Sequence, residues 1–180
     1  MRLWLGQAVS ISGSGMTGFA LGVHTYQQTG SATFFALITL FTTLPGILIS
    51  PLAGMVVDRL NRRQVMILSD TGSALTTLTL ALLFSVGHLE LWHIYLLMSI
   101  SSICNGFQFP ALQAAITQLV PKEFYSRASG MMQMSRGMQF IVSPVLAGSL
   151  MGIIGIPGIL IVDLVTFFFG IGMLLGIHIP

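Results

Sequence analysis

Residues 32–63 read ATFFALITLFTTLPGILISPLAGMVVDRLNRR, and this stretch decides the fold. Its apolar part, residues 32–57, carries no charged residue and is followed at once by a short turn with three arginines. A run of about 20 apolar residues, rising about 1.5 Å each as a helix, crosses the hydrocarbon core of a bilayer. The stretch therefore predicts a membrane-spanning helix that ends in a tight, basic turn.

Charge-free stretches of the same kind continue along the whole chain. Of its 180 residues 54% are hydrophobic and only 7% are charged, whereas a soluble domain carries about 25% charged residues. No charge occurs between Asp70 and Glu90, or between Glu90 and Lys122. This composition excludes a soluble fold and predicts an all-α, polytopic membrane protein.

Turn signals and charges divide the chain into six predicted membrane spans. The spans cover about residues 3–26, 32–57, 64–86, 91–119, 128–153 and 157–177. They leave almost nothing for a soluble domain. We therefore expect residues 1–180 to form one transmembrane domain, with helices one to three in residues 1–88 and helices four to six in residues 89–180.

The basic residues predict the orientation of these spans, because short cytoplasmic loops collect Lys and Arg. Six of the seven bases fall at the amino terminus or in the second and fourth loops: Arg2, Arg59, Arg62, Arg63, Lys122 and Arg127. The other loops contain no base, so both termini are expected to be cytoplasmic. A net charge of +2 without a basic patch excludes a nucleic-acid partner; the expected surroundings are the lipid bilayer.

A weak internal repeat suggests two sets of three helices. Residues 49–54 read ISPLAG and residues 142–148 read VSPVLAG, which places similar motifs in the second and fifth spans. These spans cross in opposite directions, as an inverted repeat requires. The alternative is that Ser, Pro, Ala and Gly recur by chance in apolar helices.

The turn after the second span carries the most specific motif: Gly54, Asp58, Arg59, Asn61, Arg62 and Arg63. It resembles the loop between helices two and three of the major facilitator superfamily, and every charged position of that pattern is present. Asn61 stands where the family has a second glycine. Asparagine tolerates a left-handed backbone better than most residues, so the turn is expected to survive.

The resemblance implies a conformational latch, in which Asp58 lies near the amino end of helix three and engages bases and the other half of the transporter. A carboxylate is favoured at a helix amino terminus. The alternative is that the loop only sets the topology through its arginines. Asp58→Asn separates the two, because only a latch predicts reduced transport with normal insertion.

Other residues are similar to the export branch of that family, which includes macrolide efflux proteins and enterobactin exporters. They include Trp4, Gly6, Gln7 and Ser10 in the first span, Pro45 and Pro51 in the second, and Pro110, Ala111 and Gln113 in the fourth. In the fifth span, Ser143, Pro144, Ala147 and Gly148 resemble the antiporter signature, with small residues for two of its glycines. Ser102 stands where many proton-coupled relatives have arginine, which puts the usual proton relay in doubt.

Taken together, the resemblance implies the amino-terminal half of a secondary transporter in a bacterial inner membrane, with the carboxyl-terminal half absent from this chain. The expected activity is efflux of an amphipathic small molecule, a drug or a siderophore, by alternating access with a second six-helix half. The alternative is a degenerate half-transporter that acts as a membrane partner or regulator. No cofactor or metal is expected: His88, Glu90 and His93 in one exterior loop lack a fourth ligand, and no phosphate-binding glycine loop is present. An intramembrane enzyme would need paired catalytic residues at one depth, and none is evident.

Three charges fall inside predicted spans, where each is costly unless paired or wetted. Asp70 and Arg136 lie about 9 and 12 Å from the cytoplasmic side, and Asp163 lies about 9 Å from the opposite side. Depth therefore favours Asp70 as the partner of Arg136. We expect Arg136 to face a central cavity or a charge network beneath it; the alternative is that it snorkels to the interface.

The first span carries a small residue at every fourth position: Gly6, Ser10, Ser14, Gly18 and Gly22. Such a seam lets a neighbouring helix approach closely in lipid. We therefore expect the seam to pack against another helix rather than to contact substrate.

Overall fold

The computed structural model describes residues 2–176 and is helical almost throughout. The elements are α1 (Arg2–Thr29), α2 (Ala32–Val57), α3 (Arg62–Ser85), α4 (Leu91–Leu119), the 3-10 turn η1 (Lys122–Phe124), α5 (Tyr125–Gly137), the π turn η2 (Met138–Val142) and α6 (Ser143–Leu175). No strand occurs within these described residues. The predicted all-α class is confirmed.

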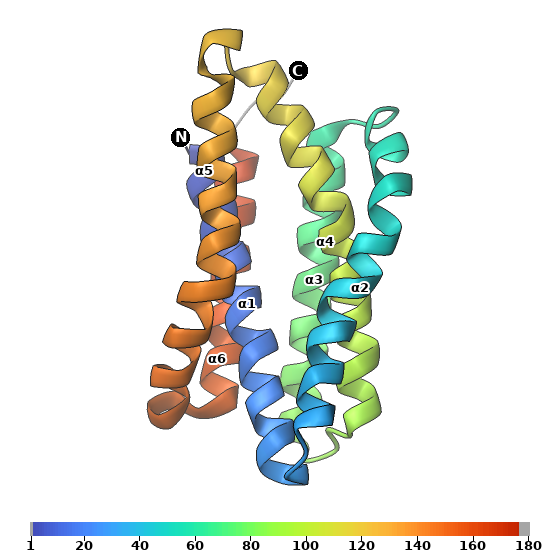
Figure 1. Ribbon diagram of the computed structural model, residues 1–180, viewed down its shortest axis with the longest axis vertical. Helices are drawn as coiled ribbons and strands as arrows, with labels where there is room; N and C mark the ends of the chain where they lie inside the picture. The colour runs from blue at the N-terminus through green and yellow to red at the C-terminus, as the bar shows by residue number, and fades with distance from the viewer. Residues whose placement is uncertain (1, 177–180) are drawn as a thin grey trace.

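α6 contains a break at Gly155, whose φ of 65° and ψ of −173° are not helical. Figure 1 shows that the chain doubles back there, so the part of α6 after Gly155 runs beside α1. Only glycine adopts this backbone readily, and Pro157 follows where a new helix can begin. The run Lys122–Leu175 has 54 residues and would be about 80 Å long as a straight helix, against a hydrocarbon core of about 30 Å. The reversal therefore lies where the sequence predicts a turn between residues 153 and 157, although the count of six spans in two repeats stays a prediction.

The π turn η2 follows from Pro144, which has no backbone N–H and whose ring crowds the carbonyl four residues earlier. The Ser143 N–H donates to the carbonyl of Met138, five residues back. The helix thereby absorbs the proline with a widened turn rather than ending. Gln139 and Phe140 lie in this turn and line the cavity described below.

The outer surface is apolar, as a lipid-facing surface must be. Three helical stretches of the described chain are long and apolar enough to cross a membrane: Ala32–Val57, Arg62–Ser85 and Lys122–Leu175. Large apolar side chains on several helices point outward, among them Leu48, Leu68, Ile153 and Phe168. A soluble monomer rarely exposes such large apolar patches, whereas lipid accommodates them.

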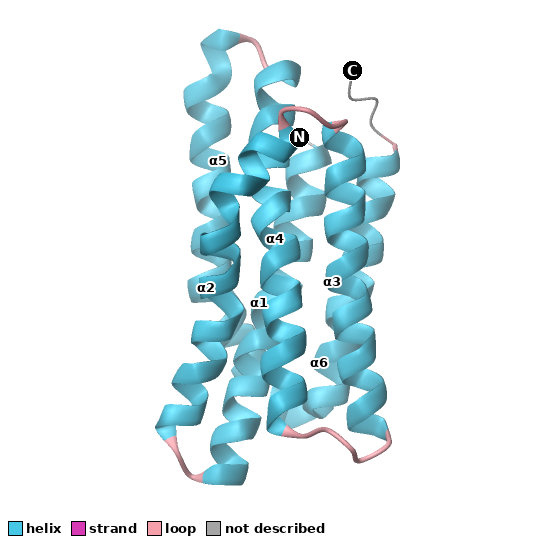
Figure 2. Cartoon of the chain, turned by 90° about the vertical axis from the view of Figure 1, so that its right-hand side faces the viewer, coloured by secondary structure: helices cyan, strands magenta, loops and turns pink. Residues whose placement is uncertain are grey.

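The helices lie side by side along the long axis, with α1 packed against α6, α2 against α4, and α3 against both α4 and α6 (Figures 1 and 2). Small residues let these helices approach: a Cβ built on Gly6 would lie 2.8 Å from that of Met173, and one on Gly170 would lie 3.2 Å from that of Ser10. The predicted packing role of the α1 seam is confirmed at Gly6 and Ser10, whereas Ser14 also lines the cavity.

The bases other than Arg136 lie at or near one end of the bundle. α1 begins there, α6 ends there, and the turns that carry Arg59 and Lys122 lie there too, whereas the turns at Gly30, Gly87 and Gly155 lie at the other end (Figure 1). This is the arrangement that the positive-inside rule predicts for a chain with both termini on one side of the membrane. Which side is cytoplasmic stays a prediction.

Candidate functional site

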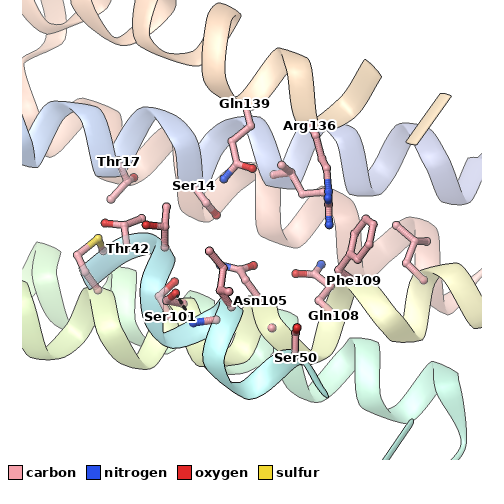
Figure 3. A pocket seen from close by; sticks show the side chains of 18 of the residues that line it. Ser14, Thr17, Thr42, Ser50, Ser101, Asn105, Gln108, Phe109, Arg136 and Gln139 are labelled. Carbon is pink, nitrogen blue, oxygen red and sulfur yellow. Dashed lines mark hydrogen bonds between the residues drawn. The ribbon is translucent and has the colours of Figure 1, made fainter. Parts of the chain in front are cut away.

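A cavity of about 570 Å³ opens between α1, α5 and η2 on one side and α2 and α4 on the other (Figure 3). Hydroxyl and amide groups line much of it: Ser14, Thr17, Thr42, Thr43, Ser50, Thr77, Ser101, Ser102, Asn105, Gln108, Gln113 and Gln139. Apolar side chains and two charged residues, Arg136 and Asp163, complete the lining. The volume lies within the range of about 300–1,000 Å³ of small-molecule sites, and the mixed lining suits an amphipathic ligand.

Arg136 reaches into this cavity from α5 and stacks on Phe109 of α4. Its guanidinium carbon lies 3.5 Å from the centre of the Phe109 ring. Among the described residues no carboxylate lies within ion-pairing distance of it, and the residue is exposed to the cavity. Arg136 thus lines this cavity, and its role in a substrate site stays a prediction; the predicted pairing with Asp70 is wrong, because Asp70 has other partners.

Asp70 is fully buried in α3 and binds two amides instead of a cation. Its carboxylate accepts hydrogen bonds from the Nε2 of Gln108 at 2.6 Å and of Gln7 at 3.1 Å. The Gln108 Nε2 also donates to the Oε1 of Gln7, so the three side chains form a closed network that joins α1, α3 and α4. Amides satisfy the carboxylate without a second charge, which is why Arg136 is not needed as its partner.

Asp163, in the part of α6 beyond the break, forms a similar network with hydroxyl groups of other helices. It accepts hydrogen bonds from Thr17 at 2.8 Å, Thr77 at 3.0 Å and Ser14 at 3.4 Å. Asp163 is 1% exposed and lies at the wall of the cavity. Its network joins α1, α3 and α6. The sequence alone did not indicate Thr17, Thr77 or Gln108 as partners of the buried acids, because uncharged polar residues are frequent in all the spans.

The turn between α2 and α3 holds the residues of the predicted latch. Asn61 caps α3: its Oδ1 accepts from the N–H groups of Arg63 at 3.0 Å and Gln64 at 3.4 Å. Its φ of −66° and ψ of 114° are extended, so the expected left-handed backbone is wrong. Asparagine serves here as a helix cap, one of its preferred positions.

The charged members of that turn have separate surroundings. Arg63 donates from Nη2 to the carbonyl of Leu175 at 2.8 Å, which ties the start of α3 to the end of α6. Asp58 and Arg59 are exposed in the turn, Arg62 begins α3, and a Cβ on Gly54 would meet nothing within 4 Å. Asp58 makes no side-chain hydrogen bond or ion pair to the described residues, so its role as a latch stays a prediction.

The antiporter-like residues lie where α6 crosses α1. Ser143 donates from Oγ to the carbonyl of Ser12 at 2.9 Å, and its Cβ would lie 2.9 Å from a Cβ built on Gly15. Ala147 is fully buried, Gly148 faces Phe19, and Pro144 sets the widened turn η2. The small residues therefore permit close helix approach, as expected; the implied antiport stays a prediction.

Ser102 of α4 is a helix contact as well as a cavity residue. Its Oγ accepts the Gly46 N–H at 2.9 Å, and a Cβ on Gly46 would lie 2.6 Å from the Ser102 carbonyl oxygen. A larger side chain at either position would separate α2 from α4. The structure thus gives Ser102 a packing role at the position where the resemblance suggests an arginine in proton-coupled proteins.

Comparison with known proteins agrees with this architecture. The sequence pattern of the Major Facilitator Superfamily matches residues 3–179. Macrolide efflux protein A of Streptococcus pyogenes is 31% identical over 161 residues, covering 89% of this chain and 40% of that protein. The protein of the same name from Enterococcus faecalis is 31% identical over 134 residues, covering 74% of this chain and 41% of that protein. The uncharacterized MFS-type transporter YfiS of Bacillus subtilis strain 168 is 27% identical over 169 residues, covering 93% of this chain and 39% of its own length.

The chain thus spans about two fifths of the length of these relatives, and the match runs along nearly all of the described helices. The apolar exterior, the basic turn after α2 and the polar cavity between the helices all accord with it. The chain belongs to the Major Facilitator Superfamily, a family of membrane transporters rather than enzymes.

Proposed function

We propose that this chain is one six-helix half of a secondary transporter, which exports amphipathic small molecules by alternating access together with a second six-helix half. The observation that carries the proposal is the cavity of about 570 Å³, whose wall combines hydroxyl and amide groups with apolar side chains. The relatives called macrolide efflux proteins support export as the direction. A drug or a siderophore is the class of substrate that fits.

The packing of the helices supports a three-plus-three inverted repeat. If the part of α6 after Gly155 counts as the sixth span, α1 packs on the sixth helix as α4 packs on the third. Likewise Gly106 of α4 faces Ile49 of α2, and Gly15 of α1 faces Ser143 at the start of α6. With an offset of 93 residues, Ile49 corresponds to Val142 and Ser50 to Ser143, so the two close contacts fall within one or two positions of each other under the proposed repeat.

Cysteine labelling tests the proposed orientation, in which the basic end of the bundle is cytoplasmic. Cys104 is the only cysteine, so Cys104→Ser gives a clean background for Arg59→Cys and His88→Cys at opposite ends. A membrane-impermeant maleimide should label His88→Cys in intact cells, and Arg59→Cys only after the membrane is opened. The reverse pattern would refute the orientation.

Transport is tested by the accumulation of two radiolabelled compounds, an anionic siderophore and a macrolide, in cells that express the chain alone or with a second six-helix half. We expect lower accumulation only when both halves are present. Asn105→Trp should fill the cavity and abolish the effect, whereas Leu48→Trp, on the exposed outer face, should retain it. Unchanged accumulation in every combination would instead favour the alternative that this chain is a membrane partner or regulator that does not transport.

A further inference from the structure

We propose that Arg136, held on Phe109, is a binding subsite for a carboxylate or another planar anionic group of the transported molecule. The inference rests on the proposed transport function and narrows its substrates to amphipathic anions. Both side chains line the large cavity, and Figure 3 shows Arg136 extending from α5 toward Phe109 of α4. The guanidinium is the cationic group of that cavity's lining.

The two carboxylates inside the predicted spans already have hydrogen-bond partners. Asp70 is bound by two glutamine amides and Asp163 by three hydroxyl groups, and neither is within ion-pairing distance of Arg136. A guanidinium at membrane depth without a counter-charge is costly. An anion that enters the cavity removes that cost, so binding is favoured for an anionic ligand over its neutral analogue.

The stack on Phe109 also orients the guanidinium for such a ligand. At 3.5 Å from the ring centre the guanidinium carbon contacts the face of the ring, an arrangement that attracts the cation without using its N–H donors. Those donors lie in the guanidinium plane as a rigid fork that matches the two oxygens of a carboxylate. Figure 3 shows no hydrogen bond from Arg136 to the other side chains drawn.

The surroundings of the guanidinium define the rest of the ligand. Ile11, Phe109 and Leu112 line both the large cavity and a small one of about 20 Å³ that adjoins Arg136. Gln139, three residues after Arg136 in η2, offers an amide on the same wall as Arg136 (Figure 3). An apolar body beside Arg136, with polar substituents toward Gln139, would occupy this end of the cavity.

The test uses the full chain in lipid nanodiscs and two fluorescent probes that differ in one group, dansylglycine and its carboxamide dansylglycinamide. We expect the acid to bind about tenfold more tightly than the amide, the size of effect given by hydrogen bonds to a charged group. Arg136→Gln should remove this preference by weakening only the acid, and Arg136→Lys should keep part of it. Equal binding of the two probes to the unmodified chain would overturn the anionic subsite while leaving an amphipathic cavity.

Two phenylalanines of the cavity provide matched variants that retain the cation. Phe109→Leu removes the stack and should lower the preference for the acid, whereas Phe140→Leu, which also lines the cavity, should weaken both probes alike. Equal effects of the two variants would contradict the role of the stack.

The titration is then repeated with both halves present. Loss of the acid preference there would mean that the second half supplies the counter-charge, which overturns the subsite; failure of both probes to bind would contradict the proposed function itself.

Discussion

Replacement of Gly46 by alanine tests the closest approach between α2 and α4. The added Cβ would lie 2.6 Å from the carbonyl oxygen of Ser102 and 2.9 Å from its Oγ. A backbone carbonyl in a helix cannot rotate away, so the two helices must separate. The hydrogen bond from the Gly46 N–H to Ser102, 2.9 Å long, would lengthen with them.

The size of the effect follows from these two losses. Overpacking of this kind costs about 1–3 kcal/mol, and a weakened hydrogen bond adds about 1 kcal/mol. Alanine is a better helix former than glycine by about 1 kcal/mol, which hides part of the loss. Gly130→Ala corrects for this gain, because Gly130 is also helical and a Cβ there meets nothing within 4 Å. The two variants should therefore differ in stability by about 2–4 kcal/mol.

The assay is thermal unfolding of the purified chain in detergent micelles, followed by helical circular dichroism. For a chain of this size, about 1 kcal/mol corresponds to roughly 2–4 °C, so Gly46→Ala should melt at least about 4 °C below Gly130→Ala. Melting temperatures that agree within about 1 °C would mean that α2 and α4 do not approach as described. A second substitution, Ser102→Gly, leaves the carbonyl in place and should not rescue Gly46→Ala.

Three further experiments test the sequence-predicted residues. Asn61→Ala removes the cap of α3 and should lower the free energy of unfolding by about 1 kcal/mol, whereas Asn61→Gly should cost only a few tenths of that; both are measured by the same melting assay. Asp58→Asn should reduce efflux by the complete transporter about fivefold or less, because a carboxylate near a helix amino terminus contributes about 1 kcal/mol at most, with insertion into the membrane unchanged; normal efflux would remove the latch. Asp70→Arg should lower the yield of folded protein, because the amides around Asp70 cannot accommodate a guanidinium. The double variant Asp70→Arg with Arg136→Asp should have the same low yield. A restored yield would show that the two residues form an ion pair after all.

The spans could be read from the sequence because their determinants are local. A charge-free apolar run and the basic turn after it define α2 and the start of α3, and Gly155 with Pro157 marks the reversal inside α6. The cavity-facing position of Arg136 was also predictable, because a charge in a span must find water, a partner or the interface.

The partners of the buried charges could not be predicted, because they depend on which helices touch. Counting residues along each span places Asp70 and Arg136 at similar depths, yet α3 packs against α4 and α6 rather than against α5. The partners of Asp70 are the amides of Gln7 and Gln108, and no sequence spacing indicates that these residues lie near Asp70. The backbone conformation of Asn61 could not be predicted for a different reason. The family pattern has a glycine at this position, which suggests a left-handed backbone, whereas the asparagine side chain favours capping the next helix.

Asp70, Asp163 and Arg136, the charges inside the predicted spans, have different roles that follow from the packing of their helices. Asp70 and Asp163 each connect α1 to α3, which otherwise meet mainly through α4 and α6. Neutral donors suffice for this, because the acids are enclosed and their hydrogen bonds are complete. Arg136 lies on α5, which packs against α1 and η2, and its guanidinium reaches across to Phe109 of α4. A charge that spans the cavity in this way, with its donors free, is suited to bind a ligand there rather than to hold the bundle together.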